Sequence, residues 1–149
     1  QTGYSDHLPI YASFSTTKQN YSEVATATKM RIKNSIDYLY TIQQISNYPL
    51  KDVVVIYRSD KLAIIKQTKK DRAIMIFRPP VSLQVGSKFD IVVDMLDQFY
   101  GLKEIKEISN VALKEKDINY KEYYLDGSTI DLFDQNNINH RLIFSNVKI

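Results

Sequence analysis

The sequence predicts a mainly all-β fold, in which a small five-stranded antiparallel barrel carries one short helix and a C-terminal β extension. Five segments between residues 53 and 108 are rich in aliphatic and β-branched residues or alternate apolar with polar ones, as strands do. Short polar turns separate these segments, and only one stretch has helical spacing. A closed barrel would also remove the exposed edges that such apolar strands would otherwise present.

The region before the strands predicts a linker followed by a short helix. Residues 15–37 are mostly polar and contain neither Gly nor Pro, so we expect a linker there. We expect the helix at residues 40–48, because Thr41 can cap it and Gln44 stands three residues later, as in a capping box. Pro49 should end it.

The barrel strands are expected at residues 53–57, 62–67, 73–77, 89–96 and 102–108. The charged segment 68–72 should form the turn between the second and third strands, and Phe99-Tyr100-Gly101 the turn before the fifth.

The last part of the chain predicts a β extension at residues 113–149. Asp126-Gly127 is a favourable turn, so residues 123–125 and 129–133 should form a hairpin, and residues 140–149 a final strand. The extension would either add strands to the barrel or form a partial second unit, since Ile108-Ser109-Asn110-Val111 recurs in part at residues 144–147. Chance similarity is the alternative explanation for that recurrence.

Composition limits the class of protein without identifying it. The chain has 149 residues, 44% of them hydrophobic, and no Cys, which excludes disulfides and thiolate metal sites. Its apolar stretches are too short to span a bilayer, so we expect no transmembrane segment. It has no initiator Met, and we expect a piece of a longer protein.

The net charge of +3 is unevenly distributed. Residues 29–88 carry twelve Lys and Arg against four Asp, whereas residues 89–149 carry seven against eleven acidic residues. A basic first half suits a polyanionic partner, and a charged, solvated surface whose two halves meet on one barrel is the alternative.

An acid stands beside an imidazole near the amino terminus, in the segment Tyr4-Ser5-Asp6-His7-Leu8-Pro9-Ile10, which continues into an alternating strand up to Phe14. This segment resembles the closing motif of the endonuclease/exonuclease/phosphatase (DNase I-like) family. The resemblance implies that residues 1–14 are the terminal strand of an upstream nuclease-like domain, with His7 at the scissile phosphate and Asp6 on the metal side. An ordinary Ser-Asp-His-Leu-Pro turn is the alternative.

The same resemblance implies Mg²⁺ for the parent enzyme and an upstream catalytic domain in cis. The family's remaining metal ligands precede this motif, and a single carboxylate with one His is too poor a site to hold Mg²⁺. We therefore expect no cofactor and no catalysis from this chain alone. A stand-alone hydrolase built on Asp6 and His7 is the hypothesis that the sequence disfavours.

A second resemblance concerns residues 38–112. A helix opening with Tyr40-Thr41-Ile42, then the segments Leu83–Val93 and Phe99–Ile105 in this order, resembles the bacterial OB-fold domains attached to secreted nucleases. The sequence departs from that pattern at Ser87, where Asp is usual. The resemblance implies an OB-like barrel and a secreted, periplasmic or cell-surface bacterial location.

OB barrels often bind single strands with aromatic and cationic side chains on one face. The candidates for single-stranded nucleic-acid binding are Arg58, Lys61, Lys66, Lys69, Lys70, Arg72, Phe77 and Arg78. The competing interpretation is that Phe77 belongs to the core and that residues 69–72 form a solubilising turn. His140 is expected to be a surface residue rather than a ligand.

Two functions follow. The chain is an accessory OB domain of a metal-dependent phosphodiesterase that helps to hold nucleic acid, or it is a structural or protein-interaction β-barrel module. The first predicts a basic face, and the second an exposed apolar patch.

Overall fold

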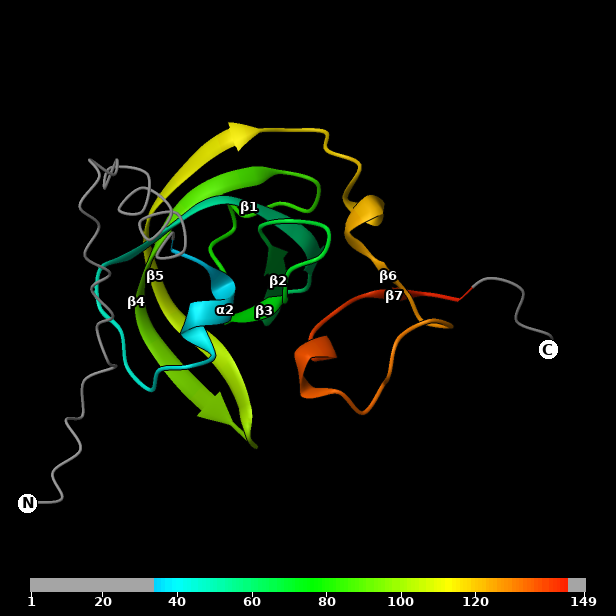
Figure 1. Ribbon diagram of the computed structural model, residues 1–149. Coiled ribbons are helices and arrows are strands. Elements are labelled where there is room, and N and C mark those ends of the chain that lie inside the picture. The colour runs from blue at the N-terminus through cyan, green and yellow to red at the C-terminus, as the bar shows by residue number, and fades with distance from the viewer. Residues whose placement is uncertain (1–33, 145–149) are drawn as a thin grey trace, which may run out of the picture. The chain divides into compact units, whose positions relative to one another are not determined.

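The computed structural model describes residues 34–144, whose five long strands curl into a ring (Figure 1). The strands are β1 (Tyr48–Arg58), β2 (Leu62–Lys66), β3 (Ile74–Phe77), β4 (Lys88–Phe99) and β5 (Leu102–Glu115). They close in the order β1-β2-β3-β5-β4, with β4 returning to β1. The predicted mainly β fold, a small five-stranded barrel with one short helix, is therefore confirmed. Asp6, His7 and the rest of the expected nuclease-like segment lie outside the described residues.

One strand pair differs from the expected antiparallel arrangement. β3 and β5 are parallel, with Met75 opposite Glu104 and Ile76 opposite Ile105. The ring is unevenly closed, because β5 pairs with β3 at only these two positions, whereas on its other side it pairs with β4 from Lys88–Glu115 to Phe99–Leu102. A parallel pair needs a crossover connection between its strands. Here β4, which lies between β3 and β5 in the sequence, is part of that connection.

Every predicted strand core lies in or next to an observed strand, but the ends differ. β1 begins at Tyr48 and includes Pro49, which stands opposite Val92 of β4. β5 continues to Glu115, beyond the expected barrel boundary at residue 112.

The predicted position of the helix is wrong. Helix α2 spans Ile36–Leu39, where the expected linker ends, and residues 40–47 form turns and irregular backbone before β1 begins. Ser35 caps the helix by accepting from the Tyr38 N–H, and Thr41 instead donates its hydroxyl to the Tyr38 carbonyl at 2.7 Å. Burial decides the position, because Ile36 and Leu39 are almost completely buried against the barrel core, whereas Ile42 and Ile45 are only partly buried.

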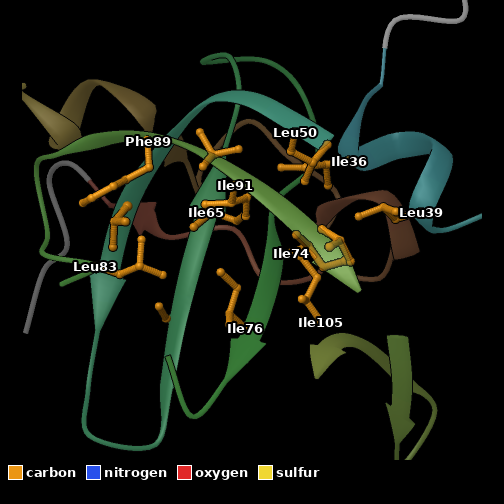
Figure 2. Close-up of a cluster of buried hydrophobic side chains, with 14 of the residues drawn as sticks. Ile36, Leu39, Leu50, Ile65, Ile74, Ile76, Leu83, Phe89, Ile91 and Ile105 are labelled. Atoms are coloured by element: carbon orange, nitrogen blue, oxygen red, sulfur yellow. The ribbon is translucent and has the colours of Figure 1, made fainter. Parts of the chain in front are cut away.

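The interior of the barrel is a continuous apolar cluster (Figure 2). Alternate residues point inward from each strand, as a period of two requires. The fully buried members that Figure 2 labels are Ile36, Leu39, Leu50, Ile65, Ile74, Ile76, Leu83, Phe89, Ile91 and Ile105. This core fixes the strand ends and turns from which the candidate ligand residues project.

After β5 the chain forms a small irregular unit of 3₁₀ turns and short strands, residues 116–144, which we call the cover. Its elements are η1 (Tyr120–Tyr123), β6 (Leu125–Asp126), η2 (Gln135–Asn137) and β7 (Leu142–Ile143). β6 and β7 pair in parallel as a separate two-stranded sheet.

The hairpin predicted around Asp126-Gly127 is wrong. The segment 129–133 forms no strand, and β6 pairs with β7 instead. Asp126 Oδ1 accepts from both the N–H and the hydroxyl of Ser128, so this side chain forms a local turn rather than a tight two-residue loop. Of the expected final strand, Leu142–Ile143 is present.

Candidate functional site

The structure separates the eight candidate ligand residues into two groups. Arg58, Lys61, Phe77 and Arg78 gather where the β1–β2 turn meets the end of β3, and we call them the end cluster. The Arg78 N–H donates to the Lys61 carbonyl at 2.8 Å, which joins the two segments. The Arg58 guanidinium donates to the carbonyl of Pro80 at 3.3 Å, so Arg58 also holds the segment that follows Arg78.

Arg78 has an unusual backbone conformation. Its φ is 46°, in the left-handed region that a residue with a Cβ seldom occupies. The backbone turn aims the Arg78 side chain back over its own neighbour, and its guanidinium carbon lies 5.1 Å from the centre of the Phe77 ring. Arg78 is exposed and Phe77 is half-buried, so the guanidinium lies over the ring and is the more exposed of the two planar groups.

A shallow hollow of about 340 Å³ lies beside this pair. Phe77 and Arg78 line one side of it, and Lys106 and Ile108 of β5 line another. Two carboxylates, Asp94 and Glu107, also line the hollow, so its charge is mixed. Lys106 forms an ion pair with Asp97 at 2.7 Å, and this hydrogen bond raises the pKa of the Lys106 ammonium.

Lys66 contradicts the expectation that it contacts a ligand. Its side chain is fully buried, and its ammonium group donates to the carbonyls of Lys69 (2.9 Å) and Tyr123 (3.1 Å). The third neighbour is His140 Nδ1, at 3.1 Å. Burial lowers the pKa of Lys66 to about 8. Lys66 therefore anchors the cover to β2 and presents no charge to solvent.

His140 is also placed differently from the expected surface position. It is half-buried against Lys66, and burial, followed by the charge of Lys66, lowers the pKa of its imidazole to about 4. Near neutral pH the ring is neutral, and its Nδ1 can accept a hydrogen bond from the Lys66 ammonium group.

The remaining candidates in the β2–β3 turn mostly face the cover as well. Lys69 pairs with Glu122 at 2.6 Å. Arg72 stacks on Tyr40, with its guanidinium carbon 3.5 Å from the ring centre, and donates to the Gln135 carbonyl at 3.1 Å. Lys70 is exposed. Three of the four cations around this turn therefore hold the chain together.

The charge of the described residues is balanced. Residues 34–144 contain 15 Lys and Arg and 15 Asp and Glu. The uneven distribution persists within this part of the chain: residues 34–88 carry nine Lys and Arg against four Asp, and residues 89–144 carry six Lys and Arg against eleven acidic residues. The described residues therefore have no net charge that would attract a polyanion as a whole, and an anion site depends on the local grouping of cations.

Two aromatic residues that were predicted only to form a turn, Phe99 and Tyr100, are highly exposed. Phe99 is 61% exposed and Tyr100 is 92% exposed, at the tip of the β4–β5 hairpin. Tyr100 and Gly101 both have positive φ, at 49° and 82°, as a tight hairpin turn of the primed type requires. The signal available in the sequence was a pair of aromatics in a position where turns usually carry small polar residues.

Within residues 34–144, no three His, Asp or Glu side chains are grouped to hold a metal ion. The helices of this described part are all too short to cross a membrane. Comparisons with protein-family models, curated proteins and solved structures found no match to this chain. The geometry of the described residues is therefore the observation that bears on function.

Proposed function

We propose that residues 34–144 form a binding module that takes single-stranded nucleic acid at the end cluster. The observation that supports this most is the Phe77–Arg78 pair, which lines the hollow together with Lys106 and is joined through the Arg78 N–H to the backbone of the exposed Lys61. Single-strand sites combine a ring or guanidinium plane for stacking with cations for the phosphates. The end cluster offers both within one turn and one strand end.

The balanced charge sets the expected strength of binding. Lys61 and Arg78 are the exposed cations of the cluster, so only about two phosphates would be neutralised. For single strands each such contact contributes about −0.7 to the slope of log K against log salt, which gives a slope of about −1.4. Affinity should accordingly be modest and the salt dependence shallow.

Fluorescence anisotropy of a labelled oligothymidine with the full chain tests the proposal at low salt. We expect saturable binding that the double variant Lys61→Ala/Arg78→Ala weakens about tenfold or more. Lys70→Ala is the matched control, because Lys70 is an exposed cation of the β2–β3 turn. Absence of binding at low salt, or equal losses in the two variants, would refute the proposal.

The parent protein is proposed to be a metal-dependent phosphodiesterase of the kind that the segment around Asp6 and His7 resembles. In that arrangement the barrel holds nucleic acid near an upstream catalytic domain in cis. The test uses a chain that includes the upstream domain and Mg²⁺. His7→Ala should abolish turnover, whereas Lys61→Ala/Arg78→Ala should raise KM and leave kcat nearly unchanged.

A second candidate function is a protein-interaction module, favoured by Phe99 and Tyr100. Their rings contact each other edge to face, with centres 4.5 Å apart, and both remain exposed. Aromatic side chains of this kind are common at the centre of protein interfaces. Failure of oligothymidine binding together with partner capture that Phe99→Ser/Tyr100→Ser abolishes would select this function instead.

A further inference from the structure

A cleft of about 730 Å³ lies between the β3–β4 loop and the start of the cover. The loop contributes one wall, and the segment 116–121 contributes the opposite wall. Its residues are Ser82, Gln84, Val85, Gly86, Ser87, Phe89, Leu113, Lys116, Asp117, Ile118, Asn119, Tyr120 and Lys121. Its volume falls within the range of small-molecule sites, about 300–1,000 Å³.

Backbone contacts hold the two walls at a fixed separation. The Ile118 N–H donates to the Gly86 carbonyl at 2.8 Å, and the Gly86 N–H donates to Val55 of β1 at 2.9 Å. Gly86 has a φ of +76°, and a Cβ there would lie 3.2 Å from the Ile118 oxygen and 3.3 Å from the Tyr120 ring. The close approach therefore requires glycine, and the cleft is formed before any ligand arrives.

The charged groups of the cleft favour an anion. Lys116 and Lys121 are exposed, and neither forms an ion pair with another residue of the described chain, in contrast to Lys69, Lys88 and Lys106. Asp117 is the one acidic residue among those that line the cleft. Two cations against one carboxylate leave a local positive charge within residues 34–144, whose net charge is balanced.

The uncharged groups favour a ring. The Tyr120 ring lines the cleft, and Val85 and Leu113 supply an apolar surface beside it, whereas Phe89 lies beneath that surface in the core. Leu113 is 48% exposed, so this surface is open to a ligand. The hydroxyls of Ser82 and Ser87 add polar groups that can select orientation.

We propose that this cleft binds a small molecule that joins a planar ring to an anionic group, of the size of a nucleoside monophosphate. The anion lies between Lys116 and Lys121, and the ring lies against Tyr120 and the apolar wall. The site contains none of the residues of the end cluster, so the two binding proposals can be tested separately.

The test is a titration of the isotopically labelled full chain with adenosine 5′-monophosphate, followed by NMR. We expect saturable shifts of the amides of Gly86, Ser87 and Tyr120, and about three- to tenfold weaker binding in Lys116→Ala/Lys121→Ala. Adenosine and inorganic phosphate, each lacking one half of the ligand, should bind more weakly. Lys61→Ala/Arg78→Ala should leave the shifts of Gly86, Ser87 and Tyr120 unchanged, because these residues lie in or beside the cleft and not in the end cluster.

Three results would overturn the inference. One is the absence of saturation up to a concentration on the order of 10 mM, where even weak small-molecule sites fill. Another is equal affinity of the wild type and Lys116→Ala/Lys121→Ala. The third is a set of shifts confined to Lys61, Phe77 and Arg78. That result would mean that the nucleotide binds at the end cluster, and it would support the nucleic-acid proposal and refute a ligand site in the cleft.

Discussion

The two faces of the β1–β2 ribbon are buried by different means. Val55 and Ile65 stand opposite each other and point into the barrel, where every neighbour in the core is apolar. Val54 and Lys66 form the next pair and point outward, yet both are fully buried beneath the cover. The inner face is sealed by non-directional apolar packing, whereas the outer face depends on directed polar contacts around one ammonium group.

The polar contacts make the cover a distinct part of the molecule. Besides Lys66, it is held by the Tyr124 hydroxyl, which donates to the Ile56 carbonyl at 3.4 Å, and by Arg141, which stacks on Tyr57 at 4.5 Å. These contacts place the cover over part of the outer face of β1 and the end of β2.

The largest effect should come from the inner face. Ile65→Ala removes a fully buried side chain from the barrel core and should lower the free energy of unfolding by about 2–5 kcal/mol. Ile64→Ala, one residue away and only half-buried on the outer face, should cost about 1 kcal/mol or less. Urea unfolding followed by circular dichroism measures both. Equal losses would show that the inner and outer faces contribute alike.

The outer face should respond locally rather than globally. Lys66→Met keeps the length of the side chain but leaves the carbonyls of Lys69 and Tyr123 and the His140 ring without their donor. Unsatisfied buried groups cost about 1–3 kcal/mol, and here the loss should loosen the cover while the barrel stays folded.

Hydrogen exchange distinguishes the two outcomes for Lys66→Met. We expect faster exchange for amides in residues 120–144 and unchanged protection in β1, β4 and the core of β5. Uniform loss of protection would mean that barrel and cover unfold as one unit. Unchanged protection of the cover would mean that the Lys66 contacts do not hold it.

The contrast between the faces also explains what the sequence could predict. The five strands could be predicted because apolar residues recur at every second position, as strands that bury one face require. Val53 and Val55, and likewise Phe89 and Ile91, are examples that lie in the core. The helix was misplaced because local capping at Thr41 competed with burial of Ile36 and Leu39, and burial depends on a core that the local sequence does not show. The hairpin at Asp126 failed for the same reason, since its partner strand lies sixteen residues further on.

The candidate site was only partly predictable. Lys61, Phe77 and Arg78 were expected to act as ligand residues, and the structure brings them together. The sequence could not show that Lys66 differs from these residues. A lysine at the end of a strand has the same local sequence pattern whether it faces solvent or is covered by a distant segment such as residues 123–140. The cleft at Gly86 depends on contacts between residues more than thirty positions apart, which leave no local pattern in the sequence.

Acid should weaken the cover by an intermediate amount. The pKa of His140 is about 4 with the cover attached and near 6.5 once the ring is free in water. The released ring thus binds more protons between these values, so the contribution of His140 to attachment is fully present above pH 6.5 and is lost as pH falls towards 4. We expect a loss of about 1 kcal/mol, less than the full shift would give because the ring is only half-buried.

The Lys66 pKa acts in the same direction at higher pH. Its value is about 8 with the cover attached, against a usual 10.5, so attachment strengthens further as pH rises from 8 to 10.5. Exchange rates of the cover measured from pH 4 to 7, with correction for intrinsic rates, test the acid part. His140→Gln should remove that dependence. If His140→Gln kept the same pH dependence of exchange, the acid response would come from carboxylates such as Glu122.

The smallest effect should come from the exposed ion pair between barrel and cover. Lys69 and Glu122 are 2.6 Å apart, but both side chains are more than half exposed. Pairs of this kind contribute about 0.2–1 kcal/mol and are screened by salt. Lys69→Ala should therefore change the exchange of the cover slightly at low salt and not at all near 1 M, whereas the effect of Lys66→Met should persist at both. If Lys69→Ala released the cover as strongly as Lys66→Met, surface charge rather than the buried ammonium would hold the outer face.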